Sequence, residues 1–170
     1  IIVTPSHQYP LGMVMSLARR GRLLEIARQH GCWIVEDDYD SDFRYAARPL
    51  PSLQGLDESG LVIYAGSFSK MLFPGLRLGY AVVPECLARA FASGVAELYR
   101  EGQLMTQSIM AEFLREGYIN SHMRRMRSLY AARRARLIDA VQARYGSTLR
   151  IVGDKAGLHL VLALPRHVDD

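Results

Sequence analysis

Lysine is nearly absent from this sequence. The chain has 21 basic Lys and Arg residues, of which only Lys70 and Lys155 are lysines. An arginine guanidinium stays protonated and is a poor nucleophile, whereas a lysine amine can lose its proton in a desolvated pocket and form a Schiff base. A lysine retained among so many arginines indicates a position that requires an amine. Lys155 lies in a glycine-containing turn where we expect it to be exposed, so Lys70 is the candidate.

Cysteine is scarce as well, and Cys32 and Cys86 form no CxxC pair. This argues against a disulfide framework and favours a reduced, cytoplasmic setting. No apolar run approaches the roughly 18 residues that a membrane-spanning helix needs. No basic segment followed by an apolar stretch marks a signal peptide. We therefore expect no association with a membrane.

The charge and size of the chain are those of an ordinary globular domain. Its net charge of +4 is too small to indicate nucleic-acid binding by itself. A length of 170 residues with 49% hydrophobic residues is enough for one domain with a real core. Because the chain begins inside a β-branched run at Ile1 and ends in a polar stretch, we expect it to be a piece of a larger protein.

The segment around Lys70 combines a predicted strand with groups that bind anions. Residues 61–65 (LVIYA) form a short apolar run typical of a buried strand, and GSFSK follows at once. Ser67, Ser69 and Lys70 are thus predicted to leave the sheet at a strand exit, where open α/β sheets bind ligands. A Pro-Gly turn follows, and Arg77 beyond it offers a planar guanidinium suited to a phosphate.

A second polar cluster follows the apolar strand predicted at residues 32–35. The sequence there continues as EDDYD. Because side chains alternate along a strand, Asp37 and Tyr39 are predicted to share one face, and Glu36 and Asp38 the other. Without a lysine one βαβ crossover later, a solvated turn or a simple carboxylate cluster would be the preferred interpretation.

The rest of the pattern predicts alternating strands and helices. Further strands are expected at residues 1–4, 78–83, 149–152 and 158–164, and helices at 16–30, 85–100, 106–116 and 119–141. Residues 41–60 are irregular in composition, so we expect a surface connection there with at most one helical turn near Ser52. The arginines of the first helix, including Arg20, are predicted to face solvent.

Three segments together resemble a known family. SFSKMLFPGLRLGY resembles the Schiff-base lysine segment of fold-type-I pyridoxal-phosphate enzymes, the aspartate-aminotransferase superfamily. Together with TPSHQYPLG and EDDYDSDFRY, it is most similar to the aminotransferase-like domain of MocR-type transcription regulators of the GntR superfamily. Tyr9 precedes Pro10 where the superfamily usually carries an asparagine, which weakens the match to an ordinary aminotransferase.

The resemblance implies that the chain binds pyridoxal 5'-phosphate. Lys70 would hold the cofactor as an imine, Asp37 would keep its ring nitrogen protonated, and Tyr39 would lie near its phenolic oxygen. We prefer Asp37 to Asp38 for the ring nitrogen because Asp37 is predicted to share its face with Tyr39.

The phosphate site and the fold follow from the same resemblance. Ser67, Ser69 and Arg77 would bind the phosphate. The fold would be α/β, with the mostly parallel sheet of the fold-type-I large domain and residues 78–83 as its antiparallel strand. Residues 1–100 would be part of this cofactor-binding large domain, and residues 101–170 would form connecting helices and the start of the small α+β domain.

The implied function is that of a sensor domain in a transcription regulator, which forms an imine with a small-molecule amine or amino acid. Such a regulator would contact DNA through a winged-helix domain outside this sequence, and the full-length protein would be a homodimer. The alternative is a free-standing pyridoxal-phosphate aminotransferase of the aminoadipate or kynurenine type. A third hypothesis, nucleic-acid binding by the arginine-rich helix at 119–141, is disfavoured because such basic runs are usually solvated faces.

Overall fold

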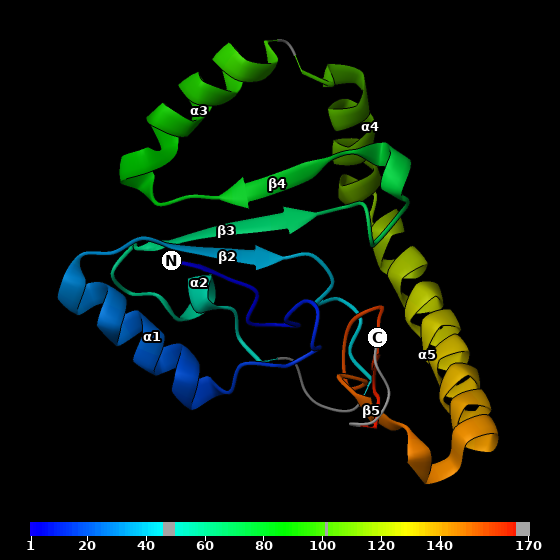
Figure 1. The fold of residues 1–170 in the computed structure, drawn as a ribbon. Helices are drawn as coiled ribbons and strands as arrows, with labels where there is room; N and C mark the ends of the chain where they lie inside the picture. Colours follow the sequence, from blue (N-terminus) through cyan, green and yellow to red (C-terminus); the bar gives the residue numbers. More distant parts are fainter. Residues whose placement is uncertain (46–49, 101, 166–170) are drawn as a thin grey trace.

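The computed structural model describes residues 1–45, 50–100 and 102–165. In chain order its elements are β1 (Ile2–Val3), α1 (Leu17–His30), β2 (Ile34–Asp38), α2 (Leu53–Leu56), β3 (Val62–Ser67), the 3₁₀ turn η1 (Pro74–Leu76), β4 (Gly79–Val82), α3 (Glu85–Tyr99), α4 (Leu104–Arg115), α5 (Tyr118–Tyr145), the 3₁₀ turn η2 (Gly146–Thr148), β5 (Arg150–Val152) and β6 (Val161–Ala163). Strands and helices alternate through the first half, and helices dominate the second (Figure 1).

The larger sheet has the strand order β1-β2-β3-β4. β1, β2 and β3 run parallel, and β4 is antiparallel to β3. This confirms the predicted α/β class and the antiparallel strand at residues 78–83. β5 and β6 form a separate antiparallel pair. The assignment of residues 1–100 and 101–170 to two domains stays a prediction.

The core of the larger sheet lies under α1 and α2. Both helices lie on the same side of the sheet (Figure 1), where Ala27, Ile34, Leu53 and Val62 form one buried cluster. α1 starts where the Ser16 hydroxyl accepts a hydrogen bond from the Arg19 backbone N–H, and it ends at a left-handed glycine. This packing anchors the amino-terminal half of β2 and leaves its carboxyl end for the site.

Arg20 corrects the prediction that the arginines of α1 face solvent, because its side chain is completely buried. Its guanidinium donates to the backbone carbonyls of Met15, Pro51 and Pro5 at 3.2, 2.9 and 2.9 Å. It also lies 3.7 Å from the buried Glu36 carboxylate. A buried charge is tolerated only when it is paired and hydrogen-bonded, and Arg20 meets both conditions.

Glu36 joins β2 to the start of α2. Its two carboxylate oxygens accept hydrogen bonds from the backbone N–H groups of Leu53 and Gln54 at 3.0 and 2.9 Å. Burial raises the pKa of Glu36 above its ordinary value, although these two N–H groups and Arg20 act in the opposite direction. The helical turn expected near Ser52 is α2 itself; residues 46–49 of the predicted connection lie outside the described residues.

The long helix α5 connects the two sheets (Figure 1). Near its start, a ring nitrogen of His122 lies 2.9 Å from the Met71 carbonyl in the loop after β3. Further along, Arg127 donates to the Asp42 carbonyl at 2.8 Å, and Arg134 forms an ion pair with Asp154 at 2.5 Å. Some of the arginines of this helix therefore form contacts with other segments of the same chain.

Some element ends differ from those predicted. β2 continues through Asp38, and α4 begins at Leu104 rather than at residue 106. The strand predicted at 158–164 is limited to Val161–Ala163, because the residues before it contact the loops of the larger sheet. Among the described helices, none combines the length and apolar character needed to cross a membrane.

Candidate functional site

The polar residues of β2 and β3 lie at one edge of the larger sheet. The two strands are parallel, so their carboxyl ends meet, and Asp37 and Asp38 are opposite Ala65 and Gly66. Ser67 is the last residue of β3, and Ser69 and Lys70 follow it. This is the edge where open α/β sheets bind ligands.

Asp37 and Asp38 have different environments. Asp38 is buried, and its carboxylate accepts hydrogen bonds from the Tyr64 hydroxyl at 2.8 Å and the Ser41 N–H at 3.1 Å. Asp37 is exposed and forms no hydrogen bond or ion pair with the described residues. Partial burial, together with repulsion from Asp38 and Asp40, raises the pKa of Asp37. Asp37 is thus the carboxylate available to a ligand.

Tyr39 lies just beyond β2 and is half-buried. Its hydroxyl donates a hydrogen bond to the His7 backbone carbonyl at 2.6 Å. Burial and the neighbouring carboxylates of Asp40, Asp37 and Asp38 raise the pKa of Tyr39 to about 12. The phenol therefore keeps its proton at neutral pH.

The loop after β3 carries Lys70 on the surface. The Ser69 N–H donates to the Ser67 hydroxyl at 3.2 Å, and the Leu72 N–H donates to the Phe68 carbonyl at 2.9 Å. Lys70 is exposed and has no hydrogen bond or ion pair within the part of the chain that the structure describes. Its amine can therefore react with a ligand.

Arg77 follows η1 with its backbone in the left-handed region, at φ 50°. Arginine seldom adopts this conformation, which costs on the order of 1 kcal/mol, and such backbones occur often at functional sites. The residue is exposed. Its backbone turns the chain into β4, opposite the end of β3.

The absence of a side chain at Gly66 lets the Tyr80 ring of β4 pack against β3 beside this loop. A Cβ atom at Gly66 would lie 2.4 Å from the Tyr80 ring, closer than atoms can approach. The Tyr80 ring also packs 5.2 Å from that of Phe68, measured between centroids. A side chain at Gly66 would therefore push Tyr80 away from the start of the Lys70 loop.

The entire chain, residues 1–170, matches the family described as aminotransferase class I and II. The chain belongs to this family. It is 46% identical over all its residues to the probable rhizopine catabolism regulatory protein MocR of Rhizobium meliloti, and 44% identical over 95% of its length to the uncharacterized HTH-type transcriptional regulator YhdI of Bacillus subtilis. It spans about a third of the length of each, 34% in both cases.

Solved aminotransferase structures confirm the fold. The kynurenine aminotransferase of Pyrococcus horikoshii, solved in complex with PMP, superposes with a TM-score of 0.90 at 28% identity. That match covers 99% of this chain and 42% of the other. The predicted fold-type-I architecture is therefore correct.

The six predicted site residues come from two adjacent segments. Asp37 lies in β2 and Tyr39 directly follows that strand. Ser67 ends β3, and Ser69, Lys70 and Arg77 lie between β3 and β4. Pairing of β2 with β3 places the two segments at the same edge. The bond from the Ser69 N–H to the Ser67 hydroxyl is the only direct hydrogen bond among the six in the described residues.

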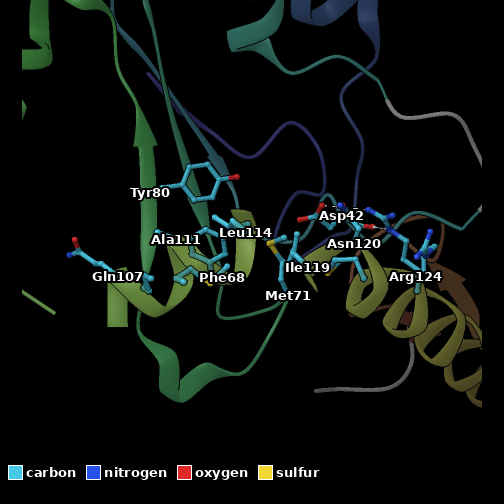
Figure 2. Close-up of a pocket in the computed structure, with 15 residues that line it drawn as sticks. Asp42, Phe68, Met71, Tyr80, Gln107, Ala111, Leu114, Ile119, Asn120 and Arg124 are labelled. Atoms are coloured by element: carbon cyan, nitrogen blue, oxygen red, sulfur yellow. Dashed lines mark hydrogen bonds and ion pairs between the residues drawn. The ribbon is translucent and has the colours of Figure 1, made fainter. Parts of the chain in front are cut away.

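A cavity of about 1030 Å³ adjoins the Lys70 loop (Figure 2). Phe68 and Met71 line it from the loop, Tyr80 from β4, and Met110 and Ile119 from α4 and α5. None of the six predicted site residues is among its described lining residues. The cavity is mainly apolar, and its polar lining residues, Asp42, Gln107, Asn120, Arg124 and Arg127, are not those predicted for the cofactor site.

Sequence reasoning missed a buried cluster beside Tyr39, made by His7, Asp40 and His159. The His7 Nδ1 atom lies 2.9 Å from an Asp40 carboxylate oxygen, and the His7 and His159 rings stack with centroids 4.2 Å apart. His159 is more than 100 positions from the other two residues, and nothing in the local patterns indicates that the three meet. The histidine in TPSHQYPLG was the only available signal.

Proposed function

We propose that this chain is part of the pyridoxal-phosphate-binding, aminotransferase-like sensor domain of a MocR-type transcription regulator. The observation that carries the proposal is the similarity to MocR, which extends over every residue of the chain at 46% identity. The similarity to YhdI, named an HTH-type regulator, supports the same class. Because the chain spans a third of these proteins, their DNA-binding part would lie outside it.

The donor groups at the sheet edge fit pyridoxal phosphate. The cofactor carries an aldehyde, a basic ring nitrogen, a phenolic oxygen and a phosphate, and when bound it supplies an electron sink. The Lys70 amine, the Asp37 carboxylate and the Arg77 guanidinium are exposed and unpaired among the described residues. The kynurenine aminotransferase to which the chain is similar was solved with PMP, the amino form of this cofactor, which supports the assignment.

Each group would have a separate task. Lys70 would hold the cofactor covalently, Asp37 would hold a proton at the ring nitrogen, and the protonated Tyr39 would lie beside the phenolic oxygen. The hydroxyls of Ser67 and Ser69 would bind the phosphate with Arg77, whose planar fork can donate two parallel hydrogen bonds.

The ligand sensed would be an amine or an amino acid, because the aldehyde that the cofactor would supply can form an imine with any primary amine, as it would with the Lys70 amine. The full-length protein would be a homodimer and would bind DNA through a winged-helix domain. Ligand binding at the sheet edge would thus change the activity of the winged-helix domain, which would lie outside this chain.

Borohydride trapping tests the proposed site directly. The full-length protein that contains this chain is mixed with pyridoxal phosphate and reduced, and the labelled peptide is identified by mass spectrometry. We expect one labelled peptide, containing Lys70. Lys155 is also exposed and provides an internal control for non-specific labelling. Label on Lys155 alone would show that the site assignment is wrong.

A free-standing aminotransferase is the second candidate, favoured by the TM-score of 0.90 to the kynurenine aminotransferase. The gene sequence upstream of Ile1 separates the two candidates. A winged-helix segment and a linker support the regulator, whereas a start codon with a short arm supports the enzyme. Repeated turnover of an amino acid with a 2-oxo acid would also favour the enzyme.

A further inference from the structure

The His7 side chain joins three segments that are far apart in the sequence. Its Nδ1 atom lies 2.9 Å from an Asp40 carboxylate oxygen, just after β2, and its Nε2 atom lies 3.3 Å from the Gly153 carbonyl, between β5 and β6. His7 is 1% exposed and Asp40 3%. Both neighbours are hydrogen-bond acceptors, and each ring nitrogen faces one of them.

The loop between β5 and β6 is bound closely to this position. The Leu158 N–H donates to the same Asp40 carboxylate at 3.2 Å, and the Gly157 N–H donates to the Phe43 carbonyl at 2.6 Å. A Cβ atom at Gly157 would lie 1.9 Å from the His7 Nδ1 atom, so only glycine permits the approach. The contact between the β5–β6 loop and His7 therefore depends on the backbone position of Gly157 and on the position of the His7 ring.

The backbone of His7 makes the connection to the proposed cofactor site. Its carbonyl oxygen accepts the hydrogen bond from the Tyr39 hydroxyl at 2.6 Å. The ring of His7 is thus fixed by Asp40 and Gly153, and the carbonyl of the same residue fixes the Tyr39 oxygen. Asp40 directly follows Tyr39 in the chain. The side chain and the backbone carbonyl of His7 are therefore bonded to two consecutive residues, Asp40 and Tyr39.

We propose that His7 is a positioning residue, through which the Gly153–Leu158 loop sets the place of the Tyr39 hydroxyl beside the cofactor. The inference rests on the proposed function, since it gives Tyr39 its role. A movement of the small β5–β6 sheet would change the position of the phenol without any contact between that sheet and the cofactor. Through His7, the position of the Gly153–Leu158 loop would then determine the position of the Tyr39 hydroxyl.

The test uses the full-length protein loaded with pyridoxal phosphate. The absorption band of the lysine-bound cofactor is titrated with pH in the parent, His7→Phe, Tyr39→Phe and the double variant. The Tyr39 hydroxyl donates its only proton to the His7 carbonyl, so its oxygen would meet the cofactor's phenolic oxygen as an acceptor. Loss of that bond would shift the titration midpoint by about one pH unit. We expect His7→Phe to shift the midpoint in the same direction as Tyr39→Phe, by about half as much.

The double variant distinguishes an effect through Tyr39 from an independent effect. If His7 acts through the phenol, the double variant has the midpoint of Tyr39→Phe alone, because coupled residues are not additive. If His7 only stabilises the fold, His7→Phe lowers the melting temperature and leaves the midpoint at the parent value. That result, or an additive double variant, would overturn the inference.

His159→Phe is the matched control. It keeps an aromatic ring against His7, and its Nε2 atom is buried without a hydrogen-bond partner among the described residues. We expect its midpoint to equal that of the parent; a shift as large as that of His7→Phe would contradict the inference. If His7→Phe does not fold, Asp40→Asn removes the charge that holds the ring and should shift the midpoint in the same direction.

Failure of the inference can be distinguished from failure of the proposed function. A parent protein without the absorption band of a lysine-bound cofactor refutes both. A parent with the band, a shift in Tyr39→Phe and none in either His7→Phe or Asp40→Asn refutes only the role of His7. A band that Tyr39→Phe does not shift removes the role of Tyr39, and the role of His7 with it.

Discussion

Substitution of Asp37 by asparagine should remove a chemical function at almost no cost in stability. The Asp37 side chain is exposed and has no bonded partner among the described residues. Surface substitutions of this kind change the free energy of unfolding by about 0.5 kcal/mol or less. The proposed bond from its carboxylate to the cofactor ring nitrogen is charge-assisted and worth about 1.5–3 kcal/mol. Its loss should weaken cofactor binding roughly 10- to 150-fold.

The matched variant is Asp38→Asn, one residue away on the opposite face of β2. The buried Asp38 carboxylate accepts hydrogen bonds from Tyr64 and Ser41. An asparagine amide can replace only one of the two oxygens, so we expect a loss of about 1.5–3 kcal/mol in the free energy of unfolding. Asp37→Asn should therefore impair cofactor binding and chemistry, whereas Asp38→Asn should lower the free energy of unfolding.

The assay is a cofactor titration of the full-length protein, followed by single-turnover absorbance changes on adding an amino acid, with melting temperatures measured in parallel. Asp37→Asn should bind the cofactor at high concentration, lose most of the transamination half-reaction and melt at a temperature no lower than the parent. Asp38→Asn should melt at a lower temperature and still react. If Asp38→Asn loses the reaction and Asp37→Asn keeps it, the alternation argument has chosen the wrong face of the strand.

Three further predictions concern single positions. Arg20→Met should lower the free energy of unfolding by about 3–5 kcal/mol, because it leaves a buried carboxylate unpaired, whereas the exposed Arg19→Met should have little effect in the same denaturation experiment. Arg77→Lys should weaken cofactor affinity about tenfold for each 1.4 kcal/mol lost with the bidentate fork, and an unchanged affinity would exclude a phosphate role. The raised pKa of Asp37 means that the folded state keeps this proton to higher pH than the unfolded state, so its ionisation lowers stability as pH rises through that interval. The melting temperature of Asp37→Asn relative to the parent should therefore increase from acid to neutral pH, and a decrease would show that the carboxylate is stabilising.

The sequence predicted those parts of the fold that depend on local patterns. The apolar runs at residues 32–35 and 61–65 were sufficient for β2 and β3. The period-two alternation after Val35 was sufficient to place Asp37 on the face opposite Glu36 and Asp38. The SFSK and PGLR segments were sufficient to predict the family. Each of these signals lies within about ten consecutive residues, where the geometry of a strand or a turn dictates which side chains emerge together.

The features that could not be predicted depend on contacts between distant segments. Arg20 occupies a position of α1 that periodicity assigns to solvent, yet the carbonyls that bind it come from the loops after β1 and before α2. His7 and His159 meet because the β5–β6 loop folds back onto the larger sheet. A pattern along the chain does not contain this information. The roles of the six site residues remain predictions.

The length of α5 has a mechanical consequence. Its 28 residues form a rod of about 42 Å, which begins against the Met71 carbonyl beside Lys70 and ends at the turn that leads into β5. A tilt of about 5° around the Met71 contact at His122 would displace the far end by roughly 3 Å. If it tilted as a rigid rod, the helix would act as a lever: a shift of less than 1 Å near the lysine would correspond to a displacement at the small sheet comparable to the length of a hydrogen bond.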